Sequence, residues 1–446
     1  MALPAASSVR RPRFNHLVSG YFSGAAVAIF WAVLFVLACA PHARAATYYW
    51  DTNNGTAGFG TAGGTWAAPT TNNATQGWST DSTGGTALSG TTTTTTTDAL
   101  NFGTSSAQLA TGTITVSGNV SANTITLVGS SSNITLSGGN ITLGGTSPAI
   151  TMTNSANTTS IIDTISSNIT LGANQTWTIN NGGTVGLANL TVSGVISGTN
   201  FGITKAGNGT LTLSGINTYT EATTVSAGNL NLSGSISNSG GTTINGGTLN
   251  ITSSSAISSG NVTINNTGVL LISNNSAISG GNITVNNGGT LSGSTNTITN
   301  NITATTGTAQ FGGTLTLNGV ISGSANVTVL NSGTVTFNGN NSYTGNFTVG
   351  SGITYFNSIA NSGVASALGA GSKITIGLGS GNQPVLYYTG TSALSTNRTI
   401  VAVANTFNIH SLNASLTLAG SVTMGSTQNM TLNGNAGGGS NFNEIS

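Results

Sequence analysis

Charged residues are almost absent from this chain. Asp, Glu, Lys and Arg make up 3% of its 446 residues, against about 25% in ordinary globular domains. Four of the seven basic residues fall within the first 44 positions, and the chain beyond position 45 carries three basic and six acidic residues, a net charge of 3 − 6 = −3. Because no basic patch remains to meet a phosphate backbone, we expect no nucleic-acid partner.

Cysteine and histidine are equally scarce. The single cysteine, Cys39, lies in the first 45 residues, so the chain that follows has neither a disulfide nor a thiolate metal site. His410 is the only histidine after position 45; a Ser–His–Asp triad with Asp163 can be written, but it has no specificity in a chain so rich in serine. Turns carry Asn or Gly where calcium-binding repeats need Asp. We therefore predict no cofactor and no metal.

Carboxylates are too dispersed for a typical glycan-cleaving site, which holds two of them close together. None of the six acids beyond position 45 lies within ten residues of another. We predict no enzymatic activity and no catalytic residue. The enzymatic alternative, a β-helix lyase or hydrolase, stays open and requires Asp163, Glu221 and Lys205 in one groove.

The abundant residues favour an all-β fold. The chain has 65 glycines, and low charge with much Gly, Ser, Thr and Asn is also typical of disorder. However, 37% of the residues are hydrophobic, and they alternate with polar residues, as in strands with one buried face. Three such runs, separated by Gly or Asn, make up the stretch from Ile203 to Leu232.

This stretch recurs at two periods. It returns at 327–356 with a gapless offset of 124, and its lead-in at 190–198 returns at 315–323 with an offset of 125. A shorter period near 20 runs between the copies, as in Ala256-Ile257-Ser258 and Ala277-Ile278-Ser279. The long repeat is thus close to six short ones. Three short strands in about 20 residues predict one turn of a right-handed parallel β-helix, or solenoid.

The residues from Lys205 to Val225 resemble the autotransporter-associated β-strand repeat, K-x-G-x-G-T-L-T-L-S-G-x-N-T-Y-T-G-x-T-T-V. Glu221 departs from the motif, where the second copy has Gly345, and the second copy has Val329 in place of Lys205. The resemblance implies a scaffold role for the motif residues Gly207, Gly209, Leu211, Leu213, Gly215, Asn217, Tyr219, Gly228, Gly333, Tyr343, Gly345 and Gly352.

Two details of the motif lead to specific expectations. Tyr219 and Tyr343 should pack near a coil corner, with the hydroxyl in water or on a turn carbonyl. If the turn at Glu221 needs a positive φ, a non-glycine residue costs about 1 kcal/mol there. We then expect Glu221→Gly to stabilise the protein.

Three segments follow from the pattern. Residues 1–45 are predicted to be a signal peptide with a basic start, an apolar run and cleavage between Ala45 and Ala46; an uncleaved anchor, a lipoprotein signal and a twin-arginine signal are alternatives. Residues 46–110 concentrate aromatics and are predicted to cap the open end of the solenoid, with a threonine-rich loop at Thr91–Thr97. Exposed tryptophans that stack on sugars are the alternative.

The third segment, 111–446, is predicted to form the β-helix coils. A further lead-in at 430–434 implies a third long repeat beginning near residue 443, so we expect the sequence to be truncated at its C-terminus. The resemblance implies an exported protein that resembles an autotransporter passenger, located at the cell surface, in association with the outer membrane or outside the cell. An outer-membrane barrel or a continuation of the chain, absent from this sequence, would supply its attachment.

The predicted function is structural or adhesive, through weak contacts repeated along a stiff rod. The expected partner is a host or environmental glycan or protein. A third alternative is ice binding by a flat ladder of threonines, which needs Thr-x-Thr on one face of successive coils; the irregular repeat spacing argues against it.

Overall fold

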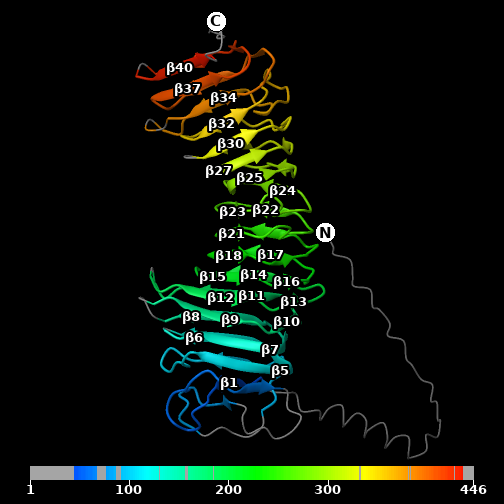
Figure 1. Ribbon diagram of the computed structural model, residues 1–446, viewed down its shortest axis with the longest axis vertical. Coiled ribbons are helices and arrows are strands. Elements are labelled where there is room, and N and C mark those ends of the chain that lie inside the picture. Colours follow the sequence, from blue (N-terminus) through cyan, green and yellow to red (C-terminus); the bar gives the residue numbers. More distant parts are fainter. Residues whose placement is uncertain are drawn as a thin grey trace, which may run out of the picture. The chain divides into compact units, whose positions relative to one another are not determined.

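The computed structural model describes residues 45–434, apart from 68–76, 87–91, 130, 156–158, 184, 331–332, 380, 382 and 426. These residues contain forty strands and no helix, hence no helix that would cross a membrane. The predicted signal peptide, except for Ala45, and the predicted third repeat near 443 lie outside the described residues. The fold is a parallel β-solenoid, as predicted, with strands stacked from β1 to β40 (Figure 1).

The strands form the faces of a three-sided coil. Face I is a 13-stranded sheet, parallel except where β1 meets β3. It contains β1 (Thr47–Trp50), β3 (Trp78–Ser79), β4 (Ala99–Phe102), β6 (Thr124–Gly129), β8 (Ala149–Asn154), β11 (Gln175–Asn180), β14 (Ile203–Ala206), β17 (Thr223–Val225), β20 (Thr242–Ile244), β22 (Val262–Ile264), β24 (Ile283–Val285), β26 (Ile302–Thr303) and β28 (Ile321–Ser322).

Faces II and III belong to one 23-stranded sheet, because four long strands turn the corner between them. These are β5 (Gly112–Ala122), β7 (Ile134–Leu143), β25 (Thr290–Ile298) and β27 (Thr308–Leu317). Face II adds β2 (Thr65–Ala67), β9 (Ile161–Ile165), β12 (Ala188–Val192), β15 (Thr210–Leu213), β18 (Asn229–Leu232), β21 (Thr248–Ile251), β23 (Val269–Ile272), β29 (Asn326–Val329), β31 (Phe347–Val349), β33 (Lys373–Ile376), β36 (Thr399–Ala402) and β39 (Val422–Thr423).

Face III continues the second halves of the long strands. It contains β10 (Asn168–Leu171), β13 (Ile196–Ser197), β30 (Thr334–Phe337), β32 (Ile353–Phe356), β34 (Val385–Tyr388), β37 (Thr406–Ser411) and β40 (Asn429–Gly434). Two short pairs complete the coils: β16 (Ile216–Asn217) with β19 (Ser235–Ile236), and β35 (Leu394–Thr396) with β38 (Leu416–Leu418).

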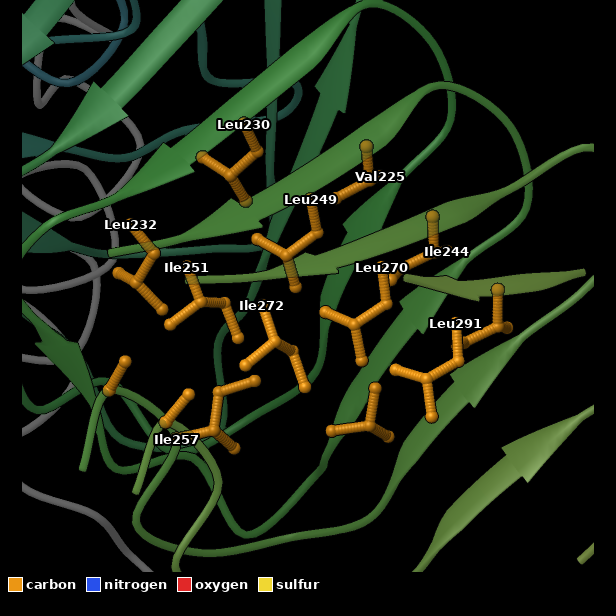
Figure 2. Packing of buried hydrophobic residues seen from close by; sticks show 14 of the residues in the cluster. Val225, Leu230, Leu232, Ile244, Leu249, Ile251, Ile257, Leu270, Ile272 and Leu291 are labelled. Carbon is orange, nitrogen blue, oxygen red and sulfur yellow. The ribbon is translucent and has the colours of Figure 1, made fainter. Parts of the chain in front are cut away.

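The core is a set of apolar columns inside the coil. Alternate side chains of each strand point inward and are buried, and strand pairing in register places them directly above one another. Figure 2 shows one such column, formed by Leu230, Leu249, Leu270 and Leu291. Each fully buried side chain of this kind contributes about 1.5–3 kcal/mol, so stability accumulates coil by coil.

Coil length varies more than the sequence suggested. On face II, Leu211 and Val329 belong to the same column of register partners, with five residues of the intervening strands between them. Six coils therefore take 329 − 211 = 118 residues. The long offset of 124 exceeds six coils by six residues, which is one strand and its turn. The second copy of the long repeat therefore lies one face further around the coil. Its strand β30 is on face III, whereas the matching β15 is on face II.

The aromatic residues of the first described coils form a buried cluster. Trp50, Trp66 and Trp78 are at most 1% exposed, and Trp78 meets Trp50 and Trp66 edge to face at centroid distances of 4.9 and 5.6 Å. The Nε1–H of Trp66 donates to Thr94 in the threonine-rich loop. Because these rings are buried, the alternative of exposed tryptophans that stack on sugars is wrong.

Candidate functional site

Both copies of the repeat have an asparagine at the same position, and it makes the same contact in each. Asn217 Oδ1 accepts the N–H of Ile196 at 3.0 Å, and Asn341 Oδ1 accepts the N–H of Ile321 at 2.7 Å. Both amides are buried. Each one satisfies a backbone donor of the coil below, which would otherwise be buried without a partner.

Lys205 is buried in the core column between Trp177 and Val225. Its ammonium group donates to the carbonyl oxygens of three turn residues: Ala206 at 2.8 Å, Gly207 at 2.9 Å and Ala227 at 3.2 Å. Burial lowers the pKa of Lys205 to about 8. The side chain therefore ties two successive turns together, and it is not available to a ligand.

Both repeat tyrosines are buried at coil corners, but their hydroxyl groups differ. Tyr219 Oη lies 2.6 Å from Thr223 Oγ1, which also accepts from Asn238. Tyr343 Oη is buried without a hydrogen-bond partner among the described residues, and Arg398 lies near enough for its charge to act on the phenol. The prediction of a hydroxyl in water or on a turn carbonyl is wrong for both.

Glu221 also corrects a sequence-based expectation. Its φ is not positive, nor is that of Gly345, although Gly207 of the same motif does have a φ of 76°. A Cβ on Gly345 would lie 2.1 Å from the carbonyl oxygen of Ala325. Gly345 is therefore required by a close backbone approach, and the turn at Glu221 imposes no such demand. The basis for a stabilising Glu221→Gly substitution is gone.

The residues of the enzymatic alternative are not brought together. Asp163 is buried on β9, where its Oδ1 accepts the N–H of Ile134 at 2.7 Å, and burial raises its pKa to about 7. Glu221 is exposed and lines a cavity of about 240 Å³ that includes neither Asp163 nor Lys205. His410 is on β37, many coils away from β9 (Figure 1).

Threonines do align on face I, despite the irregular spacing that argued against ice binding. One outward column runs through seven strands in register, namely Thr176, Thr204, Thr224, Thr243, Thr263, Thr284 and Thr303. The next outward position holds Ala206, Ser226, Asn245, Asn265 and Asn286 on the middle strands. The middle strands thus carry a single threonine rank. A second rank, Thr126, Thr151 and Thr178, runs only through β6, β8 and β11, so the Thr-x-Thr pattern is confined to the first strands of the face and does not continue over the middle coils.

An uncharged cavity of about 600 Å³ opens beside face III near the C-terminal coils. Its wall is the loop between β34 and β35, and its lining is uncharged: Asn338, Asn340, Asn357, Ser358, Tyr388, Thr389, Gly390, Thr391, Ser392 and Leu394. The volume lies within the range of about 300–1,000 Å³ of ligand sites. No residue of this cavity was predicted from the sequence.

The polar groups of this cavity are held in place by their neighbours. Asn357 Nδ2 donates to the Asn338 carbonyl at 3.2 Å, and Asn338 Nδ2 donates to Asn318 at 2.9 Å. The Tyr388 hydroxyl donates to the Ser392 carbonyl and so fixes the loop. A Cβ on Gly390 would lie 2.3 Å from that hydroxyl oxygen. Only glycine therefore fits at this point of the wall.

An aromatic ladder flanks the cavity on the outer surface of face III. Tyr355, Tyr387 and His410 pair in register on β32, β34 and β37. Their rings stack at centroid distances of 4.8 and 4.6 Å, with interplanar angles of 14° and 23°. Tyr355 is two residues before Asn357, and Tyr387 is two before Thr389, so the ladder is close to the cavity along both β32 and β34.

One signal for the ladder was present in the sequence. Tyr355 and Tyr387 occupy outward positions that hold Thr316 and Thr336 on the preceding strands. A tyrosine in a column of threonines breaks the pattern of the repeat and therefore indicates a local feature of the surface. However, the pairs are 32 and 23 residues apart, so only the register of the folded coils brings the three rings together.

The architecture defines the protein as a parallel β-solenoid built from short three-strand coils. Within it, three segments match the family model of the Passenger-associated-transport-repeat, at residues 203–232, 227–251 and 327–354. The match confirms the resemblance to autotransporter-associated repeats and adds the segment 227–251, which the sequence reading had not separated. Neither the curated proteins nor the solved structures contain a match. Repeats and fold together fit a protein that resembles an autotransporter passenger.

Proposed function

We propose that this chain is an exported surface protein of the autotransporter-passenger type, with a structural or adhesive role and no catalytic activity. The observation that carries the proposal is the placement of three transport-associated repeats within one parallel β-solenoid. The name of the family associates these repeats with the transport of a passenger. A stack of coils with columns of uncharged polar side chains offers many similar weak contacts, which add through multivalency.

A non-enzymatic role is supported by the placement of the charged groups. The described acids include buried ones that serve the scaffold: Asp98 accepts from the backbone of Ala46 and Thr95, and Asp163 accepts from Ile134. In the part of the chain that the structure describes, no three His, Cys, Asp or Glu side chains gather at one point. Incubation of the purified chain with a panel of polysaccharides should release no reducing ends; steady release would contradict this half of the proposal.

Surface labelling tests the other half. An epitope inserted after Thr56, in an exposed loop of the first described coils, should be detected by antibody on intact cells of the source organism. Removal of the gene should reduce attachment of the cells to a surface coated with their target. Labelling that appears only after the cells are permeabilised would contradict export.

A further inference from the structure

The uncharged cavity and the aromatic ladder are neighbours along the chain, because the cavity residues Asn357 and Thr389 follow Tyr355 and Tyr387 by two residues. We take the two together as one candidate surface. We propose that this surface, defined by Tyr355, Tyr387, His410 and the ten cavity residues, binds a neutral oligosaccharide. The proposal rests on the adhesive role proposed above and names the class of ligand. It follows from the chemistry of the lining, the order imposed on it and the partners that this chemistry excludes.

The lining matches the hydroxyl groups of a sugar. It contains three amide side chains and four aliphatic hydroxyls, whereas the buried phenol of Tyr388 is already committed to the Ser392 carbonyl. Amides and hydroxyls both donate and accept hydrogen bonds, as sugar hydroxyls do, and each can therefore adapt to either role. Leu394 adds an apolar contact for the C–H faces of a sugar ring.

The polar groups are ordered before any ligand arrives. Asn338 Nδ2 donates to the Asn318 side chain, Asn357 Nδ2 donates to the main-chain carbonyl of Asn338, and the loop from Thr389 to Ser392 is tied to Tyr388. Thr389 is fixed as well, because its Oγ1 donates to the Phe356 carbonyl at 3.2 Å and its own carbonyl accepts from Asn413 at 2.9 Å. Groups that are already ordered lose less entropy on binding.

The ladder extends the cavity along the stack of coils. Because its rings stack on each other, each ring face is largely covered by the neighbouring ring, and the ring edges point outward. The half-buried rings thus present two phenols and one imidazole in a row, on an apolar base. Burial lowers the pKa of His410, which favours the neutral imidazole at pH 7.

Other ligand classes fit this surface poorly. An anionic glycan or a nucleic acid would need Lys or Arg, and neither lines the cavity. A peptide that binds by adding a strand would need an unpaired strand edge. Strand β32 is paired on both sides with β30 and β34, and β34 with β32 and β37. A neutral sugar requires neither of these features.

The test is a binding measurement on the purified chain. It is screened against a glycan array that holds neutral glucose, mannose and N-acetylglucosamine oligomers together with sulfated and uronic-acid oligomers. The best neutral oligomer is then titrated by calorimetry. We expect retention of at least one neutral series and no preference for the anionic ones.

Two variants locate the site. Thr391→Trp fills the cavity from its exposed wall, and Asn357→Ala removes one amide; each should weaken binding at least tenfold. Asn265→Ala removes an amide that donates to Asn245 on the middle coils, outside the cavity, and should leave the affinity unchanged. Melting temperatures of all three should match the parent, which shows that the fold is intact.

Three results would overturn the proposal: no neutral oligomer retained, an anionic oligomer preferred, or an affinity that both cavity variants leave unchanged. Because the assay uses purified protein, these results leave the surface-labelling experiment untouched. Conversely, labelling only after permeabilisation would refute export while the sugar affinity stood. The two proposals therefore fail separately.

Discussion

The two copies of the long repeat show which contacts the motif needs and which it can lose. The first copy, 203–232, begins on face I, and the second, 327–356, begins on face II. Both keep the buried asparagine that accepts from the coil below. The second copy lacks the lysine and the tyrosine's hydroxyl partner, since Val329 and Phe347 replace Lys205 and Thr223. The motif is thus a local unit of strand, turn and strand that works on more than one face.

The largest difference in stability is expected at the position that is Glu221 in the first copy and Gly345 in the second. Gly345→Glu forces a Cβ to within 2.1 Å of the Ala325 carbonyl oxygen, and relief requires the backbone of two coils to move. We expect a loss of more than about 4 kcal/mol, or no folded protein at all. Urea denaturation followed by circular dichroism measures it. A stability within 1 kcal/mol of the parent would show that the turns in the two copies are alike.

Loss of the lysine in the first copy should rank second. Lys205→Met keeps the apolar stem but leaves three turn carbonyls without their shared donor, which we expect to cost about 3 kcal/mol. Lys373→Met, at a partly exposed lysine on face II, is the matched control and should change stability by less than about 0.5 kcal/mol. Equal effects of the two substitutions would mean that the buried ammonium contributes nothing.

The same pair of proteins gives a pH signature. The pKa of Lys205 is about 8 in the folded chain and 10.5 ordinarily. Between these pH values the unfolded chain binds a proton that the folded chain has released, so the stability of the parent rises with pH in this window. The difference in the free energy of unfolding between the parent and Lys205→Met should therefore be constant below pH 8 and widen up to pH 10.5. A difference that narrows would contradict the lowered pKa.

The tyrosines should respond in opposite ways. Thr223→Val removes the hydroxyl shared by Tyr219 and Asn238 and should cost about 1–2 kcal/mol, because both groups stay buried. Tyr343→Phe removes a hydroxyl that has no partner among the described residues and should be neutral or slightly stabilising. Thermal melts of the two variants decide this, and a larger loss in Tyr343→Phe would reverse the comparison.

The smallest effect is expected for Glu221→Gly. The residue is exposed and has an ordinary φ, so glycine only adds freedom to the unfolded chain, at a cost of about 0.5–1 kcal/mol. This sign is opposite to the expectation from the motif alone. A higher melting temperature in the variant would restore that expectation.

The sequence predicted the fold well because its signals are local. Alternation in runs such as Thr210–Leu213 and a period near 20 suffice to predict a coil of short parallel strands. The register of strands many coils apart could not be predicted from the sequence, because coil length varies along the chain. Phe356 pairs with Tyr388, 32 residues later, whereas Leu230 pairs with Leu249, 19 residues later. For this reason the sequence did not reveal that the second copy of the long repeat lies one face further around the coil than the first.

The candidate site was missed for the same reason. Asn357, Tyr388 and Thr389 carry no motif, and only the drifted register gathers them around one cavity. The buried role of Lys205 was also hidden, because a lysine in an alternating strand gives no sign that its ammonium folds back onto turn carbonyls. In both cases the decisive contacts join residues of different coils.

Cross-linking between neighbouring coils tests most directly whether the second copy lies one face further around the coil. The structure pairs Thr316 with Thr336 on face III, and register neighbours on adjacent strands lie about 4.8 Å apart. Had the long repeat equalled six coils, Gln310 on face II would face Thr334 instead. Thr316→Cys with Thr336→Cys should cross-link rapidly with a short thiol reagent, and Gln310→Cys with Thr334→Cys should not. Rapid cross-linking of the second pair alone would contradict the shift.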